Sequence, residues 1–115
     1  MDIQFTEEQE LLRSSVQRML RDQYDFDARR KIVASEEGLG RRQWDEFAEL
    51  GLLAAPFSEA VGGLSGGPLS TMIIMHEFGR HLVVEPFVET VVVAGSLIER
   101  AGSEAQKQAY IADII

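Results

Sequence analysis

The sequence predicts an all-α protein, a bundle of five to six helices joined by short loops. Apolar residues recur at spacings of three and four, as the buried face of a helix requires. Capping patterns at Thr6–Gln9 and Ser103–Gln106 mark helix starts, and glycines follow the apolar runs where helices end. No segment shows convincing alternation of apolar and polar residues, so we expect no strand.

The first helix is predicted to begin after Thr6. Its buried stripe consists of Leu12, Val16, Met19 and Leu20. We expect this helix to fade within 24–27. The polar segment 28–40 that follows is ambiguous, partly helical and closed by glycines.

A shorter helix is predicted over 41–50. Its apolar side consists of Trp44, Phe47 and Ala48. Gly51 stands where a left-handed residue commonly ends a helix. Pro56 argues against helix in the apolar connector that follows.

Two further helices are predicted to begin at Pro68 and Pro86, because proline suits the first turn of a helix. The buried face of the first consists of Leu69, Met72, Ile73 and His76. Three consecutive valines in the second favour a strand, but the flanking proline, the alanine and the glycine that ends the segment ETVVVAG indicate a buried helix. A last helix follows Ser103 and meets no stop signal before two final isoleucines, so we expect the front part of a longer protein.

Composition limits the kind of partner. Of the 115 residues, 45% are hydrophobic and 26% are charged, as expected for a globular protein. The formal net charge of −8 disfavours binding to nucleic acids and to anionic membranes. The sequence does not begin like a secretory signal, and it has no apolar run long enough to span a membrane. It also has no cysteine. We therefore expect a cytoplasmic protein with no transmembrane segment.

A glycine-rich stretch at 59–68 raises the question of a phosphate-binding loop. Such a loop needs a lysine and a hydroxyl residue after its last glycine, whereas Pro68 and Leu69 follow Gly67 here. The spacing also departs from the dinucleotide-binding fingerprint, which requires a preceding strand. We therefore interpret the stretch as a hinge between helices.

Two other patterns suggest chemistry and fail on geometry. His76 and His81 nearly form a zinc-protease motif, but that motif needs histidines four apart. A separation of five turns the rings about 140° away from each other on a regular helix, so no metal site is expected. Glu85 and Glu89 offer an acid–base pair, yet no nucleophile or histidine accompanies them, and their expected role is structural or solvent-facing.

The helix after Pro86 carries a row of small and β-branched residues. They are Val88, Val91, Val92 and Gly95. Packing in a core explains such a row. A helix with these side chains also leaves space beside it in which a long apolar ligand can lie. Composition does not separate these two interpretations.

Four stretches, taken in order, resemble the N-terminal helical domain of the acyl-CoA dehydrogenase flavoprotein family. They are FTEEQELLRSSVQRML, WDEFAELGLLAAPFSEAVGG, STMIIMHEFGRHL and AGSEAQKQAYIADII. The segment 82–107 is most similar to a bacterial branch that includes pimeloyl-CoA dehydrogenase small subunits, to which sterol-side-chain acyl-CoA dehydrogenases are related.

The resemblance implies a three-part flavoprotein: a helical N-terminal domain, here residues 1–115, a β-rich middle domain and a C-terminal helical bundle. It implies α,β-dehydrogenation of an acyl-CoA substrate, with FAD bound mainly by the parts absent from this chain. Electrons then pass to electron-transferring flavoprotein or a similar acceptor, and the subunits form homo- or hetero-oligomers. No catalytic or flavin-binding residue is expected within 1–115, and this piece alone is expected to be inactive.

In the family that this chain resembles, the N-terminal domain lines the acyl-chain pocket and covers the flavin side of the site. Counting back from the turn AGSEAQK gives the corresponding pocket wall as Phe87, Val88, Val91, Val92 and Gly95. Two alternatives remain open. One is a non-catalytic subunit of a heteromeric acyl-CoA dehydrogenase, and the other is a free-standing helical interaction module.

Overall fold

The computed structural model describes residues 4–115. Their regular structure consists of helices, with no strand, so the all-α prediction is confirmed. Residues 1–3, with which the predicted domain begins, lie outside the described part. The helical segments are α1 (Glu7–Gln23), α2 (Phe26–Ala34), α3 (Arg41–Glu49), η1 (Glu59–Val61), α4 (Gly67–His81), η2 (Val88–Gly95), α5 (Ser96–Ala101), α6 (Glu104–Gln106), η3 (Lys107–Ile111) and α7 (Ala112–Ile114). η1 is a 3₁₀ helix, whereas η2 and η3 are π-helical.

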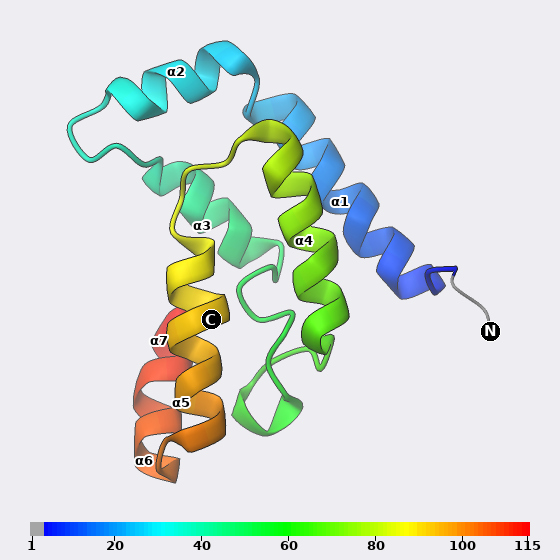
Figure 1. Ribbon diagram of the computed structural model, residues 1–115, viewed down its shortest axis with the longest axis vertical. Coiled ribbons are helices and arrows are strands. Elements are labelled where there is room, and N and C mark those ends of the chain that lie inside the picture. Colours follow the sequence, from blue (N-terminus) through cyan, green and yellow to red (C-terminus); the bar gives the residue numbers. More distant parts are fainter. Residues whose placement is uncertain (1–3) are drawn as a thin grey trace.

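The molecule is a flat slab that measures 42 × 41 × 19 Å along its principal axes. A helix with its side chains is about 10 Å across, so the slab is no more than two helices thick. α1 and α4 lie side by side and run in the same direction (Figure 1). η2 and α5 form one continuous helix that runs the opposite way, and α6, η3 and α7 return beside it.

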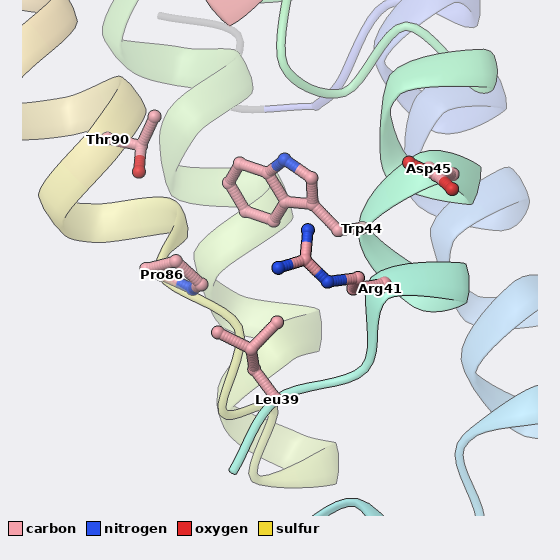
Figure 2. A pocket seen from close by; sticks show the side chains of 6 residues that line it. All are labelled: Leu39, Arg41, Trp44, Asp45, Pro86 and Thr90. Atoms are coloured by element: carbon pink, nitrogen blue, oxygen red, sulfur yellow. The ribbon is translucent and has the colours of Figure 1, made fainter. Parts of the chain in front are cut away.

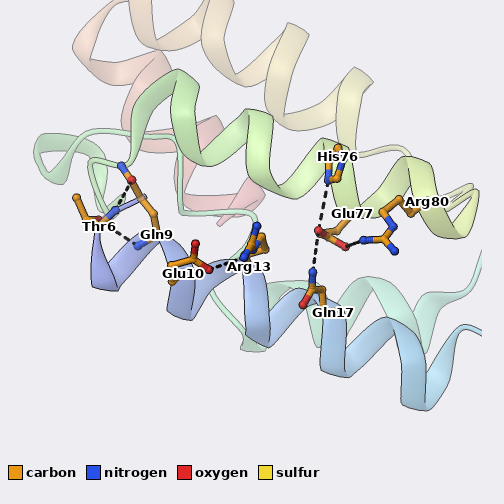
Figure 3. Close-up of polar contacts among 8 residues, drawn as sticks. All are labelled: Thr6, Gln9, Glu10, Arg13, Gln17, His76, Glu77 and Arg80. Carbon is orange, nitrogen blue, oxygen red and sulfur yellow. Dashed lines mark hydrogen bonds and ion pairs between the residues drawn. The ribbon is translucent and has the colours of Figure 1, made fainter. Parts of the chain in front are cut away.

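The start and the buried stripe of α1 are as predicted. The Thr6 hydroxyl accepts from the Gln9 amide at 3.2 Å, and the Gln9 side chain accepts from the Thr6 amide at 2.9 Å (Figure 3). Val16, Met19 and Leu20 are buried, and Leu12 is partly buried against them. The local sequence therefore sets both where this helix begins and which side it buries.

The segment that the sequence left ambiguous contains a separate helix, α2. Asp25 caps it by accepting from the Ala28 amide at 2.8 Å. Arg29 on α2 donates from Nε to the carbonyl of Leu82 at 2.7 Å, which ties α2 to the end of α4. None of the residues of α2 is fully buried, so this contact is an important part of its attachment.

The predicted buried face of α4 is wrong at most of its positions. Ile73 is buried, but Leu69 and Met72 are 38% and 50% exposed, and the His76 side chain is 67% exposed. The buried residues are Ser70, Ile73, Ile74, Glu77 and Phe78. Apolar residues occur on both sides of α4, so periodicity does not identify the buried side.

Three phenylalanines connect the helices through the core. The rings of Phe47 on α3 and Phe78 on α4 lie 4.7 Å apart, and those of Phe78 and Phe87 lie 5.3 Å apart. Aromatic pairs at this distance stabilise by about 0.5–1.5 kcal/mol beyond the area that they bury. Phe87 directly precedes η2, so this ring series fixes the point at which the second half of the chain joins the first.

The glycine-rich stretch turns the chain, as predicted. Gly62 ends η1 in the left-handed region, with φ of 92°. The amides of Ser65 and Gly66 donate to the carbonyls of Phe57 and Ala55 at 2.7 and 2.8 Å. These amides are therefore used by the chain itself and are not presented to a phosphate.

Candidate functional site

The five residues of the predicted pocket wall lie on one helical stretch but on two of its sides. Phe87 and Val91 are 1% and 0% exposed, and Gly95 is also buried, so these residues face the core of this chain. Val88 is 39% exposed, and Val92 is partly buried at the edge of the core. The open side of the wall is therefore formed by Val88 and Val92.

Gly95 permits a close approach between η2 and the connector that precedes η1. A Cβ atom added to Gly95 would overlap the ring of Phe57, which is 1% exposed. It would also lie 3.2 Å from the Thr90 carbonyl oxygen. The space on this side of Gly95 is thus filled by an aromatic ring of the chain itself.

Large apolar side chains cover the outer side of the same helix and of the one that returns beside it. Val93, Leu97 and Tyr110 are 59%, 65% and 57% exposed. A groove of about 440 Å³ lies between the two helices. Its lining consists of Leu97, Ile98, Ala101, Gly102, Gln106 and Tyr110. None of these residues belongs to the pocket wall predicted from the sequence. Exposed apolar patches of this kind mark ligand or protein contacts.

A second cavity, of about 400 Å³, lies between α3 and the start of η2 (Figure 2). Its lining consists of Leu39, Arg41, Trp44, Asp45, Pro86 and Thr90. Arg41 is paired with Glu37 at 2.8 Å, and the hydrogen bond that Arg41 donates to Glu37 raises the pKa of Arg41. Because this positive charge is paired and Asp45 adds a negative one, the cavity is poorly suited to an anion.

The structure confirms a structural role for Glu85. This residue is 5% exposed, and its Oε2 accepts from the Tyr24 hydroxyl at 2.7 Å and from the Val84 amide at 3.2 Å. Its Oε1 accepts from the Gly40 amide at 3.2 Å. We term this set of bonds the Tyr24–Glu85 clasp. Burial, and then the bond to Glu85, raise the pKa of Tyr24.

Glu89, the other member of the suggested acid–base pair, is exposed. Glu85 and Glu89 therefore differ sharply in environment. The carboxylate of Glu85 already accepts from three donors within the chain. This arrangement fits a role in fixing the backbone rather than in transferring protons.

A second buried carboxylate, Glu77, joins α1 to α4 (Figure 3). Gln17 donates from Nε2 to Glu77 Oε1 at 3.1 Å, and His76 Nδ1 lies 3.3 Å from the same oxygen. The Arg80 guanidinium lies 3.9 Å from Glu77 Oε2. His81 contacts the Glu77 carbonyl instead, at 3.2 Å, so the two histidines engage Glu77 through different atoms. Within residues 4–115 no group of three or more possible metal ligands occurs.

Helices that pack as a thin layer with an apolar outer side define an all-α helical domain. The sequence profile of the family "Acyl-CoA dehydrogenase, N-terminal domain" matches residues 6–115. The chain belongs to this family.

Individual relatives agree with this assignment. Acyl-CoA dehydrogenase IpdE2 of Mycobacterium tuberculosis is 30% identical over 101 residues, which are 87% of this chain and 32% of IpdE2. The short-chain specific acyl-CoA dehydrogenase of Clostridium acetobutylicum is 28% identical over an alignment of 117 positions. The alignment covers 96% of this chain and 29% of that protein. The chain thus spans less than a third of the length of the curated relatives it matches.

The fold has a solved counterpart in the ChsE4–ChsE5 complex from Mycobacterium tuberculosis. The TM-score is 0.90 over 99% of this chain and 31% of that chain. Because the sequence identity is 24%, this likeness concerns the fold. As for membranes, none of the helices in the described residues is both long and apolar enough to cross one.

Proposed function

We propose that this chain is the N-terminal domain of an FAD-dependent acyl-CoA dehydrogenase that introduces a double bond between the α and β carbons of an acyl-CoA thioester. The observation that carries this proposal is the family match over residues 6–115. It is supported by relatives that are themselves named acyl-CoA dehydrogenases. The β-rich middle domain and the C-terminal helical domain are then encoded outside residues 1–115.

Among the described residues, neither the glycine-rich stretch nor Arg41 fits a flavin cradle. The amides of the glycine-rich stretch donate to the chain's own carbonyls, as Ser65 and Gly66 show. The Arg41 guanidinium is paired with Glu37. We therefore assign FAD binding to segments outside the described residues and give this domain the role of covering the flavin side of the site.

The acyl-pocket wall that we propose has two functional layers. In this proposal the exposed Val88 and the partly buried Val92 contact the acyl chain, where each methylene removed from water contributes about 0.8 kcal/mol. The buried residues Phe87 and Val91 hold the helix against the core. Gly95 sets how closely that helix approaches the rest of the domain, through its contact with Phe57.

The assembly that we propose is an oligomer in the cytoplasm that passes electrons to electron-transferring flavoprotein or a similar acceptor. A fold neighbour is a complex of two different proteins, ChsE4 and ChsE5. This observation favours a second candidate, in which the chain belongs to a non-catalytic subunit of a heteromeric acyl-CoA dehydrogenase.

The experiment that tests the proposal uses the full-length, FAD-loaded protein and acyl-CoA substrates of increasing length. Val88→Phe fills the open side of the wall, so kcat/KM for long substrates is expected to fall about tenfold or more while short substrates are retained. Val33→Phe is the matched control, because Val33 is 49% exposed on α2 and lies outside the wall. Its chain-length profile is expected to equal that of the wild type.

Lack of turnover with every acyl-CoA, both alone and with a co-expressed partner subunit, would contradict the proposed function. Turnover that appears only with the partner would select the heteromeric candidate. If Val88→Phe lowers the activity on all chain lengths equally, in step with a lower melting temperature, Val88 does not contact the acyl chain.

A further inference from the structure

The Tyr24–Glu85 clasp joins three separate elements at one buried carboxylate. Tyr24 is the C-cap residue of α1, Gly40 is the N-cap residue of α3, and Glu85 lies in the linker between α4 and η2. Tyr24 and Glu85 are 1% and 5% exposed. Their hydrogen bond bridges residues 61 positions apart in the sequence.

The environment of Glu85 consists of hydrogen-bond donors. A buried carboxylate is costly unless such donors surround it, and here the Tyr24 hydroxyl and the amides of Gly40 and Val84 all donate to it. Within residues 4–115 no lysine or arginine forms an ion pair with Glu85. A buried acceptor left without donors costs about 1–3 kcal/mol, so the clasp depends on these particular donors.

Glu85 also takes the place of a capping side chain for α3. The N-cap residue of that helix is Gly40, which forms no side-chain cap bond. A carboxylate at the N-terminal end of a helix is favoured by the helix dipole. A Cβ atom added to Gly40 would overlap the Gln43 side chain and lie 3.0 Å from Glu85 Oε1, so the glycine leaves room first for Gln43 and also for the carboxylate.

The backbone around Glu85 leads directly into the predicted pocket wall. The Val84 amide donates both to the Tyr24 hydroxyl, at 3.0 Å, and to Glu85. The Glu85 carbonyl accepts from the Phe87 amide at 2.8 Å. The chain is thus fixed on both sides of Glu85 immediately before η2 begins at Val88.

We propose that Glu85 is a positioning residue for acyl-chain selection. The clasp sets the point at which η2 begins and therefore where Val88 and Val92 lie along the acyl pocket. This role rests on the proposed function, because it needs an acyl chain against η2. A displacement of about 1 Å at a substrate-positioning element can cost about a hundredfold in rate, so a small shift of η2 is enough to alter selectivity.

The test uses Tyr24→Phe, Glu85→Gln and the double variant in the full-length, FAD-loaded enzyme. Tyr24→Phe keeps the buried ring and removes one hydroxyl, and Glu85→Gln keeps the side-chain volume but replaces an accepting oxygen with an NH₂ group that cannot accept. We expect KM for the preferred acyl-CoA to rise about tenfold, with kcat within about twofold, and the difference between long and short substrates to shrink. The double variant is expected to be no worse than the stronger single variant, because both break the same clasp.

A matched control isolates the clasp. Glu49→Gln neutralises an exposed carboxylate at the end of α3, away from the clasp and from both cavities. This variant is expected to keep the wild-type chain-length profile. Amide hydrogen exchange over 87–95 gives a readout independent of turnover, and it is expected to quicken about tenfold in Tyr24→Phe relative to the wild type.

The outcomes separate the two proposals. A wild-type enzyme that turns over no acyl-CoA overturns the proposed function and the positioning role together. An active wild type whose folded Tyr24→Phe variant keeps the same chain-length profile overturns the positioning role alone. Faster amide hydrogen exchange over 87–95, together with a smaller difference between long and short substrates, supports the positioning role.

Discussion

The α1–α4 pair and the C-terminal limb, defined as residues 88–114, meet their packing requirements in different ways. α1 and α4 are regular α-helices with buried apolar sides, and Gln17 Nε2 donates to Glu77 Oε1 across the seam between them. The limb contains two π-helical segments and exposes large apolar side chains on its outer side. These side chains are Val88, Val93, Leu97 and Tyr110.

This difference indicates that the α1–α4 pair contributes mainly to stability, whereas the limb offers a surface for contacts. Apart from the buried carboxylate of Glu77, the α1–α4 pair keeps its charged side chains out of the core, and its exposed apolar residues Leu11, Leu69 and Met72 do not stop it from acting as a scaffold. The limb leaves apolar surface uncovered within the described residues, at the place where the proposed acyl pocket lies. π-helical turns are rare and occur frequently at functional sites, so both features of the limb fit a surface that meets another group.

The largest expected effect tests the scaffold. Leu20→Ala removes a side chain that is 0% exposed at the α1–α4 seam, and it is expected to lower the free energy of unfolding by about 2–5 kcal/mol. Leu11→Ala is the control on the same helix, because Leu11 is 69% exposed, and its effect is expected to stay within about 0.5 kcal/mol. Urea unfolding measures both. Equal losses from the two variants would mean that α1 does not bury this side.

Local signals explain why α1 could be predicted from the sequence. Its capping box lies within four residues, and its apolar stripe stands on an otherwise polar helix, so the pattern has only one interpretation. For α4, in contrast, the buried side could not be predicted from local signals. Its start was predicted at Pro68, one residue after the observed start at Gly67. The burial of Glu77, however, involves Gln17, a partner 60 residues away, and no local pattern selects that side.

The candidate site was predictable in part for the same reason. The resemblance located the helix of the pocket wall, but the division of that wall into buried and open sides depends on the contact of Gly95 with Phe57. The clasp was missed as well, because Tyr24 and Glu85 are distant in the sequence. One signal was present: Glu85 is a single acid within the apolar segment 82–88, and such an acid needs buried donors.

A middle-sized effect tests how the limb attaches to the scaffold. In a helix, glycine to alanine normally stabilises by about 0.5–1 kcal/mol. Gly79→Ala on α4 should follow this rule, because an added Cβ meets nothing within 4 Å. Gly95→Ala should instead destabilise by about 1–3 kcal/mol, since its Cβ overlaps the buried ring of Phe57. Thermal unfolding measures both variants: Gly79→Ala is expected to raise the melting temperature and Gly95→Ala to lower it. If both variants raise it, the Phe57 ring moves aside at little cost.

The smallest expected effect on stability tests the outer side of the limb. Leu97 is 65% exposed, so Leu97→Ser is expected to change the free energy of unfolding by no more than about 0.5 kcal/mol. If the outer side meets another domain or subunit, the same variant should weaken the assembly of the full-length protein, measured by sedimentation, whereas Leu11→Ser should not. A loss of more than about 1 kcal/mol in chain stability from Leu97→Ser would mean that the limb covers its own apolar surface. The contrast with the α1–α4 pair would then disappear, because both regions would be scaffolds.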